Sequence, residues 1–172
     1  MTDRDNAQIC KNGHVTTIYA EMNPEERQKY CIECGEKNYL VCPNCETPIP
    51  GGEIEKKYIG MGEATRHEGT KIESYSVPKY CGNCGEPYPW TKEKLQAFKD
   101  FTELTEGLSE DEKEVLENNV DDILSQTPQT KNAVLQIKGI LRDQSPEIAK
   151  TLKDLMMEFA TEVAVKYLKK GF

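Results

Sequence analysis

Apolar residues recur at a helical spacing throughout residues 91–172. Thr91 is placed to cap a first helix, residues 109–112 form a capping box, and Ser145-Pro146 marks another helix start. Thr127-Pro128 marks a helix end. The pattern predicts about four helices, whose inward faces include Leu95, Phe98, Phe101 and Leu104; Val115, Leu116, Val120, Ile123 and Leu124; Ala133, Val134, Ile137, Ile140 and Leu141; and Ile148, Leu152, Leu155, Met156, Phe159, Val163 and Leu168.

The last predicted helix, residues 146–170, has a broad apolar face. Most of its charged residues lie on one i, i+4 line, which is Lys150, Asp154, Glu158, Glu162, Lys166 and Lys170. A surface helix needs an apolar stripe of only about 100°. This helix is therefore either the centre of a bundle or a contact with another copy or with a partner protein, and we expect a homo-oligomer through residues 146–170. A membrane-surface contact of residues 169–172 is the third reading, which Glu158 and Glu162 oppose by repelling anionic lipid.

Most of the helical periodicity lies beyond Trp90. Residues 53–59 and 71–77 carry β-branched and aromatic side chains at alternating positions, and the glycine-rich residues 60–69 join them. This pattern predicts a long β-hairpin. Its role is structural, with a contact loop at residues 60–69 as the alternative.

Composition and charge divide the chain near Trp90. Of 172 residues, 37% are hydrophobic and 30% are charged, and no run approaches the ~20 apolar residues of a membrane span. Residues 1–90 have a net charge of −4 (10 basic, 14 acidic), residues 91–127 one of −7 (4 and 11), and residues 128–172 one of +3 (8 and 5). We therefore expect two domains, residues 1–90 and 91–172. Because the N-terminus lacks the pattern of a secretory signal, we also expect a cytoplasmic protein without a transmembrane segment.

All seven cysteines lie in the first of these domains. Thiols stay reduced in the cytosol, so metal ligation is favoured over disulfides. A Cys-x-x-Cys turn places two thiolates on one ion, and two such turns complete a tetrahedral zinc shell. The sequence thus predicts two structural Zn²⁺ ions per chain, held by four ligand pairs: Cys10 with His14, Cys31 with Cys34, Cys42 with Cys45, and Cys81 with Cys84.

An internal repeat indicates how the pairs combine. Residues 29–36 match residues 79–86 at six of eight positions, each with a glycine after the second Cys. These copies resemble the closing knuckles of two zinc ribbons, so the first pair joins the second and the third joins the fourth. A cross-brace, in which the first pair joins the third, stays open at this point. His14 follows an Asn-Gly turn at the position of a second ligand, whereas His67 lies in a polar stretch and is expected to be solvated.

Four segments resemble an uncharacterised bacterial family of zinc-ribbon proteins, domain of unknown function 2321. The segments lie within residues 8–92: Cys10-Lys11-Asn12-Gly13-His14-Val15, Tyr30-Cys31-Ile32-Glu33-Cys34-Gly35, Cys42-Pro43-Asn44-Cys45-Glu46-Thr47-Pro48-Ile49, and Tyr80-Cys81-Gly82-Asn83-Cys84-Gly85 followed by Pro87-Tyr88-Pro89-Trp90. The resemblance implies a bacterial or phage-borne protein with zinc ribbons, and it implies no reaction.

The motifs favour a binding module over an enzyme. The expected ligands are all used by two ions, and neither the His-Glu-x-x-His pair of metalloproteases nor a glycine-rich nucleotide loop is present. We expect an α+β, non-enzymatic adaptor or regulatory protein that binds a protein partner. The alternative is nucleic-acid binding by a hairpin with Lys56, Lys57, Arg66 and Lys71. The acidic charge of the ribbon half opposes it, because phosphate contact favours clustered Lys and Arg.

Overall fold

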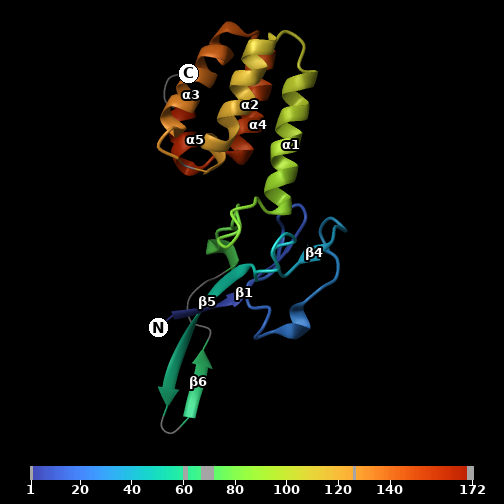
Figure 1. The fold of residues 1–172 in the computed structure, drawn as a ribbon, viewed down its shortest axis with the longest axis vertical. Helices are drawn as coiled ribbons and strands as arrows, with labels where there is room; N and C mark the ends of the chain where they lie inside the picture. The colour runs from blue at the N-terminus through green and yellow to red at the C-terminus, as the bar shows by residue number, and fades with distance from the viewer. Residues whose placement is uncertain (1, 60–61, 67–71, 126, 170–172) are drawn as a thin grey trace. The chain divides into compact units, whose positions relative to one another are not determined.

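The computed structural model describes residues 2–59, 62–66, 72–125 and 127–169. The fold is α+β, as predicted: small β-sheets in the N-terminal part are followed by five helices (Figure 1). The chain divides into two compact units, Met1–Glu93 and Lys94–Phe172, called here the ribbon unit and the helical unit. Among the described residues, no helix is both long enough and apolar enough to cross a membrane.

The ribbon unit contains two antiparallel sheets of three strands each. The first has the order β3-β2-β4, and the second has the order β1-β5-β6. The unit also contains two short 3-10 helices and the first residues of the first α-helix. The bounds are β1 Thr2–Asn6, β2 Gln8–Cys10, β3 Val15–Thr17, η1 Pro24–Glu26, β4 Asn38–Tyr39, β5 Pro50–Ile59, β6 Gly62–Arg66 and η2 Ile72–Ser74.

The predicted hairpin is present, but its second strand was placed wrongly. Strand β6 lies within the stretch expected to be a loop, and residues 72–74 form a 3-10 helix instead of a strand. Tyr75 and Val77 pack against the apolar core of the ribbon unit, and the Tyr75 hydroxyl donates to the carbonyl of Pro50. The apolar residues of this segment therefore cover the core and do not pair in the sheet.

Strand β1 has no apolar side chain, and the sequence pattern did not predict it. Its Asp5 is 3% exposed, and the carboxylate accepts backbone N–H groups of Glu21 (2.9 Å) and Met22 (3.1 Å). Arg4 pairs with Glu53 of β5 at 3.3 Å. Backbone pairing with β5 and these polar contacts hold β1 in place, and an apolar pattern reveals neither.

The beginning of β5 approaches backbone so closely that only glycine fits. A Cβ at Gly51 would lie 2.3 Å from the carbonyl oxygen of Ile18 and 2.7 Å from that of Asp5. We expect Gly51→Ala to destabilise the ribbon unit by about 3 kcal/mol, because backbone atoms must move to admit the methyl group. Urea unfolding checks this, with Gly82→Ala as the control, since no described atom lies within 4 Å of a Cβ at Gly82. Equal stability of the two variants would contradict the packing.

One apolar core serves both ribbons. It consists of Ala7, Ile9, Ile18, Cys42, Ile49, Cys81, Tyr88 and Trp90. Trp90 stacks on Tyr88 with ring centroids 4.7 Å apart, and its Nε1 donates to the carbonyl of Pro78 at 2.7 Å. The Trp90 Cβ also lies 3.3 Å from the position of a Cβ at Gly13, in the turn before His14. The stacked pair of Tyr88 and Trp90 therefore packs with residues from both expected metal sites.

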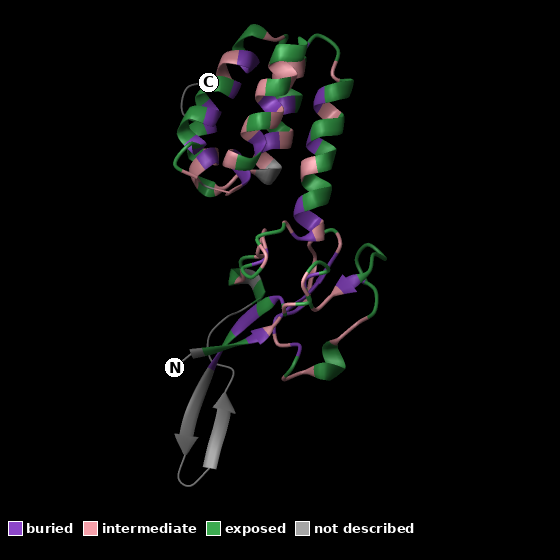
Figure 2. Ribbon diagram, in the orientation of Figure 1, coloured by how far each residue is buried: buried purple, intermediate pink, exposed green. Residues whose placement is uncertain are grey.

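The helical unit has a core of its own, and Figure 2 shows buried positions repeating along its helices. Two of the three predicted caps are confirmed: Ser109 and Glu112 exchange the bonds of a capping box, and the Ser145 hydroxyl accepts from the amide of Ile148 at 3.4 Å. The first helix begins at Pro89 and not after Thr91, whose hydroxyl donates to the carbonyl of Lys79 at 2.9 Å. The helices are α1 Pro89–Leu104, α2 Glu110–Ser125, α3 Thr130–Asp143, α4 Pro146–Phe159 and α5 Glu162–Lys169.

The long last helix expected at residues 146–170 is two helices. Ala160 is extended (φ −65°, ψ 146°), and the hydroxyl of Thr161 accepts from the amide of Ala164 at 3.3 Å, as a cap does. This break lets Ala164 and Leu168 of α5 join the core that Leu152 and Met156 of α4 also enter. The broad apolar face is thus divided between two helices of one chain. The side chain of Phe159, which the prediction placed on this face, lies outside the described residues.

Candidate metal centres

Three Cys-x-x-Cys turns have the same backbone geometry. In each, the amide of the first Cys donates to the carbonyl five residues later, and the amide four residues after the first Cys donates back to its carbonyl. For the turn at Cys31, these bonds run to Glu36 (2.8 Å) and from Gly35 (2.8 Å). Short β-bridges close the turns at Tyr30 with Lys37, Val41 with Pro48, and Tyr80 with Pro87. These bonds present both thiols of each turn on one side.

The residue after the second Cys takes a left-handed conformation in all three turns. Gly35 has φ 75° and Gly85 has φ 74°, as the repeat predicted. Glu46 occupies the same position with φ 59°, although a side chain there is strained. Glycine therefore marks two of the three knuckles in the sequence, and the third is recognised only by its cysteine spacing.

The first cluster joins the first two ligand pairs. Cys10 at the end of β2 and His14 before β3 meet Cys31 and Cys34, and their ligand atoms all lie within 4.8 Å of one another. The Cys10 and Cys34 sulfurs are 3.7 Å apart, and the Cys31 sulfur is 3.6 Å from Nδ1 of His14. Cys10 and Cys31 are buried, whereas Cys34 is exposed.

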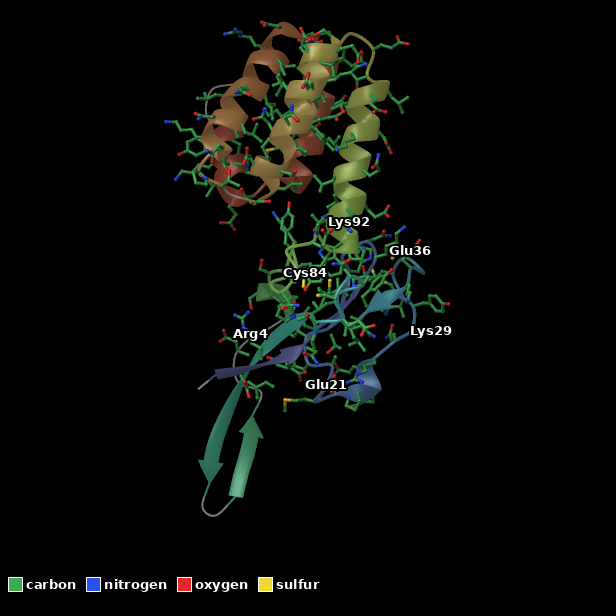
Figure 3. The ribbon with its side chains drawn as sticks, in the orientation of Figure 1. Arg4, Glu21, Lys29, Glu36, Cys84 and Lys92 are labelled. Carbon is green, nitrogen blue, oxygen red and sulfur yellow. The ribbon has the colours of Figure 1, made fainter. Side chains whose placement is uncertain are left out.

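The second cluster joins the other two pairs. Cys42, Cys45, Cys81 and Cys84 present their sulfurs within 4.8 Å of one another. The sulfur of Cys42 lies 3.8 Å from that of Cys84, and the sulfur of Cys45 lies 3.6 Å from that of Cys81. Figure 3 shows sulfur atoms, in yellow, beside the labelled Cys84. The structure therefore brings the pairs together in sequential order, and the cross-brace is not formed.

The atom spacings match a tetrahedral metal shell. With a Zn–S distance of about 2.3 Å and a Zn–N distance of about 2.0–2.1 Å, tetrahedral edges are about 3.8 Å between sulfurs and about 3.6 Å from sulfur to nitrogen. The observed separations of 3.6–3.8 Å agree with these edges. They are far longer than a disulfide bond of about 2.05 Å, and all seven cysteines are free. Both clusters can hold a metal ion.

The thiols in each cluster differ in acidity. Burial raises the pKa of Cys10 and of Cys42 to about 11. Burial also acts on Cys31, but the amides of Glu33 and Cys34 outweigh it and lower the pKa of Cys31 to about 7. Hydrogen bonds with the side chain and amide of Thr47 lower the pKa of Cys45 to about 6. At neutral pH each cluster therefore keeps at least one proton that a metal ion must displace.

Metal affinity should accordingly depend on pH. Since Cys10 and Cys42 are protonated at pH 7, each bound ion releases at least one proton, and the zinc affinity of each site should fall at least about tenfold for each unit by which the pH is lowered between pH 8 and pH 6. Competition with a zinc chelator at pH 6, 7 and 8 measures this. An affinity that does not change with pH would contradict thiol ligation.

Two further residues support the clusters, and the sequence pattern missed both. Oε2 of Glu33 lies 3.8 Å from Nε2 of His14, on the side of the ring opposite the ligand atom Nδ1. Metal-binding histidines commonly have a carboxylate at their second nitrogen, which orients the ring. The Thr47 hydroxyl lies 3.3 Å from the Cys45 sulfur. Their positions inside or directly after a knuckle are the only signal in the sequence.

Several residues weighed in the sequence cannot be placed relative to these clusters. His67 and Lys71 lie outside the described residues. Lys56, Lys57 and Arg66 are on the paired strands β5 and β6, where Arg66 stands opposite Glu55 in the register, and their side chains also lie outside the described set. The basic surface expected for nucleic acid therefore stays a prediction.

The paired knuckles and their two four-ligand clusters define a protein with tandem ribbons of the zinc-ribbon type. Residues 3–168 match domain of unknown function 2321, whose description is "uncharacterized protein conserved in bacteria". The chain belongs to this family, and the match includes the helices as well as the ribbons from which the resemblance was inferred. No curated protein and no solved structure matches the chain.

Proposed function

We propose that this protein is a non-enzymatic interaction module whose two ribbons each fold around a structural Zn²⁺ ion. The main support for this proposal is the type of ligand atom in each cluster. One cluster offers three thiols and an imidazole, and the other offers four thiols, a ligand chemistry typical of structural zinc sites. Four protein ligands fill a tetrahedral shell, so neither ion keeps a position for water or substrate.

The ions would stabilise the fold of a small unit. Cys42 and Cys81 are 2% exposed and belong to the same core as Ile9 and Ile18. A bound ion would therefore connect the knuckles directly to the apolar core. The cysteines would ligate the ions. The carboxylate of Glu33, near Nε2 of His14, would orient the imidazole ring.

Exposed apolar side chains at the knuckles support a protein as the partner. Ile32, between the two cysteines of its knuckle, is 85% exposed, and Tyr30 just before them is 54% exposed. The second copy of the repeat has Gly82 where the first has Ile32. The first knuckle thus presents a large apolar side chain that the metal site does not require. We infer that this knuckle contacts a partner protein, as in an adaptor or regulatory protein.

The test is affinity capture with the zinc-loaded chain from a bacterium that encodes it, followed by native mass measurement of the complex. We expect a stoichiometric protein partner that is lost with Ile32→Gly, a change that copies the second knuckle and should leave the zinc content at two. Capture of nucleic acid in place of protein would favour the alternative function. A partner bound equally well by Ile32→Gly would place the contact elsewhere.

A further inference from the structure

The helical unit has a groove between α3 and the beginning of α4. The groove has a volume of 580 Å³ and is lined by apolar atoms of Leu135, Leu141 and Ala149, with Gly139 between them. Leu135 is 57% exposed although it is a large apolar residue in the middle of a helix. This surface is not used by either metal site.

The described surroundings of Gly139 do not require a glycine. It lies in the middle of α3, where glycine destabilises a helix relative to alanine. A Cβ at Gly139 would meet no described atom within 4 Å, so the residue does not make room for any described neighbour. A glycine beside an exposed leucine instead leaves space for another element to approach the α3 backbone closely.

The charges at this groove indicate what approaches. Lys138 and Arg142 lie one turn apart on α3 and line the groove, and Arg142 pairs with the exposed Asp143 at 3.5 Å. Residues 128–172 carry a net charge of +3, whereas residues 91–127 carry −7. The surface that would fit is therefore apolar and flanked by carboxylates.

The end of α1 has this character. Leu104 is 81% exposed, and the exposed residues Asp100 and Glu103 lie beside it on the helix. Asp100 accepts a hydrogen bond from Gln96 of the same helix at 2.7 Å. We propose that a second copy of this chain docks on the α3–α4 groove with the end of its α1, so that Leu104 contacts Leu135 and Gly139 while Asp100 and Glu103 face Lys138 and Arg142. The proposal goes beyond the proposed function, because it concerns the helical unit and needs neither metal site.

Analytical ultracentrifugation of the full-length, zinc-loaded chain over a range of concentrations tests this. We expect the wild type to self-associate and Gly139→Leu to weaken association at least tenfold. Leucine favours helix over glycine, so the thermal midpoint of this variant should not fall, and lost association will not mean lost folding. The control is Tyr167→Ser on α5, since Tyr167 is 36% exposed on the face from which an oligomer was first expected. Wild-type protein that stays monomeric, or association weakened by Tyr167→Ser and not by Gly139→Leu, would overturn the proposal.

Charge reversal provides a second, independent test of the same contact. Lys138→Glu with Arg142→Glu should weaken association, and so should Asp100→Lys with Glu103→Lys. All four changes in one chain should restore it to within a few fold of the wild type, because the complementary pairs are formed again. Failure of the fourfold variant to associate, with unchanged zinc content and helical signal, would show that these surfaces do not face each other.

Discussion

Cys81→Ser should leave the purified protein with one zinc ion per chain instead of two and should abolish cooperative unfolding of the ribbon unit. Cys81 is 2% exposed, so the substitution removes a metal ligand and places a hydroxyl in the core that both ribbons share. Zinc contributes about 10–16 kcal/mol to the folding of small zinc domains, which is as large as the total stability of a typical domain. Few single changes in this chain should have a larger effect.

A second pair of variants replaces the two histidines of the chain. We expect His14→Ala to lower the zinc affinity of the first site more than about 100-fold, since His14 supplies Nδ1 to that cluster, whereas His67→Ala should leave both sites filled. Mass spectrometry measures the number of zinc ions bound to each variant. Equal zinc loss in the two variants would mean that the fourth ligand of the first site is misassigned.

Removal of zinc with a chelator should unfold the ribbon unit and leave the helical unit folded. The two described cores have no residue in common: the helical core runs from Phe98 to Leu168, and the ribbon core ends at Trp90. Small domains commonly depend on bound metal ions, and we expect the ribbon core to do so. We expect circular dichroism at 222 nm to keep most of its amplitude, with a loss confined to the first turn of α1.

Trp90 provides the matching signal from the other unit. It is the only tryptophan in the chain, and it is 3% exposed against Tyr88 and the turn at Gly13. Its fluorescence should shift to the red when zinc is removed, because the ring enters water. A reciprocal variant, Leu116→Glu, introduces a charge into the helical core and should abolish the helical signal while the zinc content stays at two. Loss of the helical signal on chelation of the wild type would refute the predicted boundary near Trp90.

The metal clusters could be predicted from the sequence because the relevant geometry is local. A Cys-x-x-Cys turn determines its own hydrogen bonds, and the repeat of residues 29–36 at 79–86 indicates which turns close the ribbons. The choice between sequential pairing and the cross-brace is not local. It depends on the shared core, in which Cys42 and Cys81 pack with Ile9, and on β2, which places Cys10 beside β4.

The strands were harder to predict, because the apolar pattern was a poor guide to them. β1 pairs with β5 and has polar contacts through Asp5, and β6 contains no large apolar residue, so neither shows the alternation of a strand. Tyr75 and Val77 do show that alternation, yet they cover the ribbon core outside any sheet. Side-chain periodicity reports burial, and burial is not specific to one backbone conformation.

The helices followed their periodicity closely, apart from the end of α4 and from Leu104, which was expected to face inward and is 81% exposed. Neither proline nor glycine marks the break at Ala160-Thr161. The amide of Thr161 donates to the carbonyl of Ile123 in α2 at 3.1 Å, and Ala164 and Leu168 then enter the core. This break is therefore a tertiary effect, and the capping ability of Thr161 was its only trace in the sequence.

Native mass spectrometry of the intact chain, purified without added metal, tests the central claim most directly. Two zinc ions per chain with all seven cysteines reduced is the result that the two closed clusters predict. A chain that carries no zinc or a single ion, or one whose mass shows cysteines joined in disulfides, would contradict it.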